Sequence, residues 1–127
     1  MVTFHPATLD TAATADQFQE LLTALDQLDN THLLFTKANA DTKGRMINEM
    51  IDEYIVTRPQ KTVAHTSLGQ LVYLSALKQV DGIVGNSSSG IIEGPSFRIG
   101  TVNIGDRQKG RIRAKSVIDC QPECSSI

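Results

Sequence analysis

The sequence changes character sharply between residues 82 and 93. A short apolar run, Ile83-Val84, ends at Gly85, and Asn86, three serines and a glycine then lead into a segment of helical character. This order is typical of a strand, a tight turn and a helix N-terminus. The first amide groups of a helix have no internal partner, and its dipole places roughly half a positive charge there. The junction therefore predicts a phosphate site, and an ordinary serine N-cap that binds nothing is the alternative.

Apolar runs that suit buried strands alternate with amphipathic segments along the whole chain. The expected strands are residues 2–4, 33–35, 62–65, 83–84 and 101–104. Between them the pattern predicts a helix that opens at a capping box (14–17) and closes at 29–30, a second that begins at Asp41 or Thr42 and ends at 58–59, a third capped by Ser67, and a fourth that stops near Pro95. This order predicts an α/β, Rossmann-like fold: a parallel sheet flanked by helices, with right-handed crossovers.

Length and composition narrow the class of protein. The chain has 127 residues, of which 40% are hydrophobic and 20% charged, so residues 1–127 are expected to form one domain with its own core. No apolar run approaches the roughly 18 to 20 residues needed to cross a bilayer, and no signal-peptide pattern is seen, so we expect a cytoplasmic protein without a membrane partner. The net charge of −2 argues against nucleic acid held by bulk electrostatics.

Two cysteines, Cys120 and Cys124, lie near the end of the chain. Two thiolates make half of a zinc site, and the rest of the sequence offers no His or Cys pair at ligand spacing. We therefore expect free thiols in a frayed tail, and no metal site.

Polar residues follow each expected strand, where parallel sheets bind their ligands. They are His5, Asn39, His65 with Thr66, Ser87 to Ser89, and the loop 105–107. We expect these five loops to surround one crevice, and their polar residues to bind a nucleotide diphosphate there.

Three of the candidate side chains carry specific alternatives. The imidazole of His5 suits a phosphate donor or a general acid or base, or else it simply closes a strand end. Arg107 suits a diphosphate clamp, or else it belongs to a solvated basic run. Glu93 lies almost two turns into the expected helix, where a carboxylate can accept both hydroxyls of a ribose, or it is an exposed glutamate.

Several stretches of the chain, in their order, resemble one family, the hydrolysing UDP-N-acetylglucosamine 2-epimerases of the sialic-acid type. They are VTFHPAT (2–8), FTKANAD (35–41), SLG (67–69) with YLS (73–75), VGNSSSGIIE (84–93) with PSF (95–97), and VNIGDRQKGR (102–111). The resemblance implies the C-terminal, nucleotide-binding half of a two-domain glycosyltransferase-B fold. The N-terminal catalytic domain of that fold is not in this chain.

The same resemblance implies roles for particular residues. The diphosphate would be held by Ser87, Ser88, His5 and Arg107, the ribose by Glu93 and the uracil by the backbone at Thr66, with Asn39 as a further nucleotide contact. His5 and Arg107 would also act in catalysis, by stabilising the diphosphate as it leaves.

The implied reaction eliminates UDP from UDP-N-acetylglucosamine to give 2-acetamidoglucal, and water then adds to give N-acetylmannosamine. No metal or redox cofactor is implied. Its partners would be UDP or UDP-N-acetylglucosamine, the N-terminal domain of the same protein, and further copies in a homo-oligomer. The fragment alone is expected to be inactive.

Two positions depart from the family pattern, and two other functions stay open. Gly100 stands where a proline is usual, and Arg98 where a small residue is common; both are expected in the connection before the fifth strand. The other readings are the donor-nucleotide half of a glycosyltransferase and a non-catalytic nucleotide-binding module.

Overall fold

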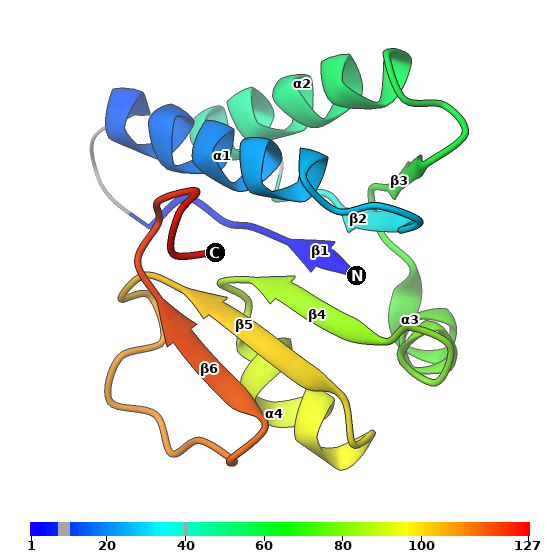
Figure 1. Cartoon of the computed structure of the whole chain (residues 1–127), viewed down its shortest axis with the longest axis vertical. Coiled ribbons are helices and arrows are strands. Elements are labelled where there is room, and N and C mark those ends of the chain that lie inside the picture. Colours follow the sequence, from blue (N-terminus) through cyan, green and yellow to red (C-terminus); the bar gives the residue numbers. More distant parts are fainter. Residues whose placement is uncertain (8–10, 40) are drawn as a thin grey trace.

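A computed structural model of the chain describes residues 1–7, 11–39 and 41–127 (Figure 1). In these residues six parallel strands form one sheet in the order β3-β2-β1-β4-β5-β6. The elements are β1 (Val2–Thr3), α1 (Thr11–Asp26), β2 (Leu33–Thr36), α2 (Thr42–Val56), β3 (Thr62–His65), α3 (Gly69–Leu77), β4 (Gly82–Gly85), α4 (Ser88–Ser96), β5 (Gly100–Ile104) and β6 (Val117–Cys120). The predicted Rossmann-like fold class is confirmed. Thr8 and Ala40, which end or interrupt two of the stretches quoted above, lie outside the described residues.

The strand order reverses beside β1, which pairs with β2 on one side and with β4 on the other. The chain first builds outward from β1 to β3 and then returns to build from β4 to β6. Figure 1 shows α1 and α2 over one face of the sheet and α4 on the other. In open α/β sheets such a reversal opens a crevice at the carboxyl ends of the two diverging strands. These ends belong to β1 and β4.

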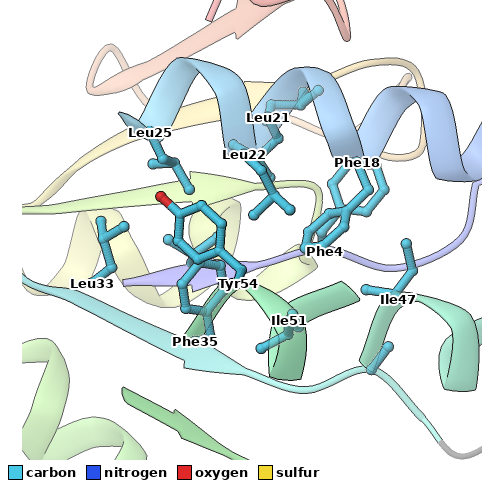
Figure 2. Packing of buried hydrophobic residues seen from close by; sticks show 13 residues of the cluster. Phe4, Phe18, Leu21, Leu22, Leu25, Leu33, Phe35, Ile47, Ile51 and Tyr54 are labelled. Atoms are coloured by element: carbon cyan, nitrogen blue, oxygen red, sulfur yellow. The ribbon is translucent and has the colours of Figure 1, made fainter. Parts of the chain in front are cut away.

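Alternate residues of the inner strands point to opposite faces, and both faces are apolar. In β2, Leu33 and Phe35 pack under α1 and α2, while Leu34 packs against the cluster on the other face. This explains why the strand reads as a continuous apolar run rather than an alternating one. Figure 2 shows the larger cluster, in which the rings of Phe4 and Phe18 lie 5.4 Å apart between their centroids.

The first helix differs from its prediction at both ends. It begins at Thr11, so Thr14 lies inside the helix, is fully buried and is not a cap. The capping box at 14–17 is therefore wrong. The helix also ends at Asp26, before the predicted stop at 29–30. No helix within the described ranges is long and apolar enough to cross a membrane.

Of the two other predicted caps, one is confirmed. The Asp41 carboxylate accepts the Gly44 N–H at 2.7 Å and caps α2. Leu68 instead occupies the N-cap position of α3 and makes no side-chain cap, so the prediction for Ser67 is wrong. The Ser67 hydroxyl still accepts the Gly69 N–H, at 3.3 Å.

The end of the chain is ordered, which corrects the expectation of a frayed tail. Cys120 lies in β6 and pairs in register with Ile104 of β5. The Cys124 N–H donates to a Glu20 carboxylate oxygen at 2.7 Å, and Gln27 Nε2 donates to Cys124 Sγ at 3.0 Å, which joins the last turn to α1. Both cysteines are free thiols, as expected.

Candidate functional site at the carboxyl edge of the sheet

The predicted site residues follow the carboxyl ends of five strands. Because every strand pair is parallel, these ends lie along one edge of the sheet. His5 follows β1, Asn39 follows β2, Thr66 follows β3, Ser87 follows β4, and Arg107 follows β5. His5 and Ser87 are half-buried, whereas Asn39, Thr66 and Arg107 are exposed.

His5 is fixed to the end of β4 by the side chain of Asn86. The His5 N–H donates to Asn86 Oδ1 at 2.7 Å, and Asn86 Nδ2 donates back to the His5 carbonyl at 2.8 Å. Asn86 is 1% exposed. The two loops that diverge at the strand reversal are therefore held together by a reciprocal amide pair.

The loop after β5 reaches the same residue from the other side. Arg107 Nη1 donates to the Asn86 carbonyl at 3.1 Å, and Gln108 Nε2 donates to that carbonyl at 2.8 Å. Gln108 is 3% exposed. The structure thus brings His5, Ser87 and Arg107 together around Asn86, and sequence reasoning missed both amide residues of this group. The only sequence signal for them is their position: Asn86 stands directly before Ser87, and Gln108 stands directly after Arg107.

The serine turn has the form of a helix start. Ser87 is the N-cap of α4, with extended backbone (φ −75°, ψ 144°), and its hydroxyl accepts the Ser89 N–H at 3.4 Å. Ser88 is the first residue of the helix. The first-turn amides have no intrahelical acceptor, and they carry the positive end of the helix dipole.

Two glycines allow the close approaches that build this turn. Gly85 has φ +139°, and a Cβ there would lie 1.9 Å from the carbonyl oxygen of Thr3. A Cβ at Gly90 would lie 2.6 Å from Cγ2 of Thr101, whose hydroxyl donates to the Gly90 carbonyl at 2.8 Å. The backbone of α4 at Gly90 therefore packs directly against the Thr101 side chain of β5, with no room for a side chain at position 90.

The charge of His5 is set by its surroundings. Burial lowers the pKa of its imidazole below the ordinary 6.5, the Arg107 guanidinium lowers it further, and Asp41 opposes both. A histidine with a lowered pKa is neutral at pH 7, so His5 offers one N–H donor and one acceptor there.

Glu93 lies farther along α4 and is half-buried. It is close enough to α3 for its charge to affect the pKa of Tyr73. The Tyr73 hydroxyl hydrogen-bonds the Ser89 hydroxyl. Burial raises the pKa of Tyr73, the Ser89 hydrogen bond lowers it, and the Glu93 carboxylate raises it. This joins α3 to the first turn of α4.

Two cavities lie at opposite edges of the sheet. One of about 310 Å³ adjoins the site and includes Asn86 and Arg107 in its lining. Another of about 750 Å³ opens at the amino edge, where it is lined by residues such as His32 and Gln79. Asn86 and Arg107 belong to the group described above, whereas the lining of the larger cavity includes none of the predicted site residues, so the chemistry favours the carboxyl edge. The hydrogen bonds around Asn86 do not extend to Asn39 or Thr66.

Comparison with known proteins shows the family to which the sequence is similar. The family model described as UDP-N-acetylglucosamine 2-epimerase matches residues 1–127. The chain is 45% identical over 121 residues to a GDP/UDP-N,N'-diacetylbacillosamine 2-epimerase (hydrolyzing) of Campylobacter jejuni, covering 95% of this chain and 32% of that protein. It is 43% identical to the polysialic acid biosynthesis protein P7 of Escherichia coli, covering 100% of this chain and 32% of that protein. The chain thus spans about a third of the length of these relatives.

Proposed function

Because the chain belongs to the UDP-N-acetylglucosamine 2-epimerase family, we propose that residues 1–127 form the UDP-binding unit of a hydrolysing UDP-sugar 2-epimerase. The observation that carries the proposal is the convergence of three loops on Asn86. It brings the main chain of His5, the serine N-cap and the Arg107 guanidinium to one residue at the strand reversal, and the His5 imidazole lies close enough to Arg107 to feel its charge. Neutral donors and one permanent cation suit a diphosphate, and they need no metal to hold it.

In the proposed complex, the diphosphate lies against the first turn of α4. Ser87 and Ser88 provide donors from the turn, while His5 and Arg107 approach from the neighbouring loops. Glu93 accepts the ribose hydroxyls. The backbone at Thr66, directly after β3, contacts the uracil, and Asn39, in the loop after β2, makes a further contact with the nucleotide.

The proposed chemistry follows from where charge develops. When the anomeric C–O bond breaks, an electron pair moves onto the leaving diphosphate, and its oxygens gain negative charge. Donors already fixed around that position stabilise the transition state more than the ground state. Arg107 provides a permanent positive charge. His5 provides a neutral N–H donor whose pKa rises as the anion beside it gains charge.

The rest of the reaction requires residues that this chain does not carry. We propose that the carboxylates which move protons at the sugar lie in the remaining two thirds of the protein, in the N-terminal half of a glycosyltransferase-B fold. On this proposal the 127-residue chain binds UDP without turning over a UDP-sugar. The sugar nucleotide is UDP-N-acetylglucosamine, as in the family description, or a nucleotide of N,N'-diacetylbacillosamine, as in the name of the Campylobacter jejuni relative.

Calorimetry of the chain with UDP tests the binding site. We expect Arg107→Ala and Ser87→Ala each to weaken binding, with about tenfold or more for Arg107, because a hydrogen bond to a charged group is worth roughly 1.5–3 kcal/mol. Arg111→Ala and Ser96→Ala are matched controls. Arg111 is an exposed residue of the same basic run, and Ser96 is an exposed residue at the other end of α4. Equal binding by all four variants would place the nucleotide elsewhere.

A further inference from the structure

Asn86 lies where three loops of the carboxyl edge meet, and all of its polar groups are used. Its side chain both accepts from and donates to the main chain of His5, at 2.7 and 2.8 Å. Its main-chain N–H donates to the Thr3 carbonyl at 3.1 Å. Its carbonyl accepts from Arg107 and from Gln108. Asn86 therefore connects every loop that supplies a donor to the proposed diphosphate site.

The burial of this residue separates its role from that of a ligand contact. Asn86 is 1% exposed and Gln108 is 3% exposed, so neither side chain presents much surface to a bound molecule. A reciprocal pair with a peptide group also requires a donor and an acceptor on one side chain of this length. Asparagine provides both, whereas an ionised aspartate offers only acceptors and would turn one of them toward the His5 carbonyl.

We propose that Asn86 is the positioning residue of the diphosphate site, which fixes the spacing between the His5 imidazole, the serine turn and the Arg107 guanidinium. The proposal rests on the function proposed above. It assigns to one buried amide residue the joining of all three loops, because Asn86 lies in the loop after β4 and hydrogen-bonds to both of the others. Donors held at fixed spacing lose no ordering entropy when the anion arrives.

The test compares two buried asparagines in the 127-residue chain. Asn103 is also 1% exposed, and it pairs with Gly85 at the same edge, but its Nδ2 donates to Asp119 Oδ1 of β6 at 2.7 Å rather than to one of the three loops. We expect both Asn86→Ala and Asn103→Ala to lower thermal stability. Only Asn86→Ala should weaken UDP binding, by about tenfold or more, while Asn103→Ala changes it less than about threefold.

A second ligand separates positioning from general loosening of the fold. Uridine lacks the diphosphate, so its affinity, measured by NMR titration, should be equal in wild type and Asn86→Ala. A parallel loss of UDP and uridine binding would overturn the positioning role, as would unchanged UDP binding. Failure of the wild-type chain to bind UDP would overturn the proposed function and this inference together, so the two failures are distinguishable.

Gln108→Leu keeps the proposal testable if Asn86→Ala does not fold. This change removes one of the two donors to the Asn86 carbonyl, together with Gln108 Oε1, which has no hydrogen-bond partner among the described residues. We expect about a threefold loss of UDP affinity with uridine binding unchanged. Unaltered UDP binding in a folded Gln108→Leu chain would contradict the proposal.

Discussion

The two faces of the sheet are covered differently. Helices α1 and α2 cover one face with many large buried side chains, whereas α3 and α4 bury few large side chains on the other. Phe18, Leu21 and Ile47 on the first face are each 0% exposed. On the second face Leu71 of α3 is 81% exposed and Ile92 of α4 is 54% exposed. The buried cluster there is small, with Met1, Leu77, Ile83 and Ile99 at its centre.

The comparison separates what stabilises the fold from what builds the site. The first face gains its stability from apolar burial, at about 25 cal/mol per Å². The second face holds α4 by glycine contacts with β5 and by hydrogen bonds such as that from Thr101 to Gly90. A helix seated in this way brings its N-terminus close to the strand ends. The two faces should therefore respond to different kinds of substitution.

The largest expected effect is the loss of a core side chain on the first face. Leu21→Ala should lower the free energy of unfolding by about 2–5 kcal/mol, because it leaves a cavity under α1. Leu71→Ala, the same chemical change on exposed α3, should alter it by less than about 0.5 kcal/mol. Urea denaturation followed by circular dichroism measures both. Similar losses for the two leucines would remove the distinction between the faces.

A smaller effect is expected from adding a methyl group where α4 meets β5. Alanine is normally preferred to glycine within a helix, by about 1 kcal/mol. We nevertheless expect Gly90→Ala to lower the free energy of unfolding by about 1–3 kcal/mol, because the new Cβ meets Cγ2 of Thr101.

The neighbouring threonine supplies the control for this change. Thr101→Ser removes only Cγ2 and keeps the hydroxyl that donates to Gly90. In the double variant Gly90→Ala, Thr101→Ser the next atoms lie at least 3.5 Å from the new Cβ, so much of the lost stability should return. A single Gly90→Ala variant as stable as wild type in urea would show that α4 is not seated by close contact.

The smallest expected effect is on the pKa of His5, which lies at the carboxyl edge of the sheet. We expect its pKa, followed by NMR of the imidazole, to lie below 6.5 and to rise in Arg107→Gln, which removes the second cause of the shift. The unfolded chain binds a proton at His5 at higher pH than the folded chain does. This group's contribution to stability is therefore complete above about pH 6.5 and is lost as the pH falls through the lowered pKa. A pKa above 6.5 would contradict this, because the effect of Asp41 would then outweigh burial and Arg107 together.

The fold could be predicted because its signals are local. Apolar runs and amphipathic segments alternate at short spacing, and a parallel order then places the loops of His5, Ser87 and Arg107 at one edge. The sixth strand escaped prediction because it is a half-exposed edge strand whose apolar pair, Val117-Ile118, is followed at once by a charged residue. Ile118 is 65% exposed and Asp119 follows it.

Other features depend on contacts between distant residues. Asn86 and His5 are 81 positions apart in the sequence, so no local pattern identifies their amide pair. Thr14 was mistaken for a cap because the sequence does not indicate that the helix has already begun at Thr11. Arg98 has φ 60°, a left-handed conformation that favours glycine, and no local pattern in the sequence predicts it. Gly100, expected in the connection before β5, is instead the first residue of that strand.

The central claim, that a diphosphate is held at the carboxyl edge, is tested most directly by titrating the ¹⁵N-labelled chain with UDP and following its amide signals. The account predicts saturable shifts at His5, Ser88 and Ser89 and at the side chain of Arg107, with the core of α1 and α2 unchanged. Shifts gathered instead at His32 and Gln79, around the cavity at the amino edge, would contradict it.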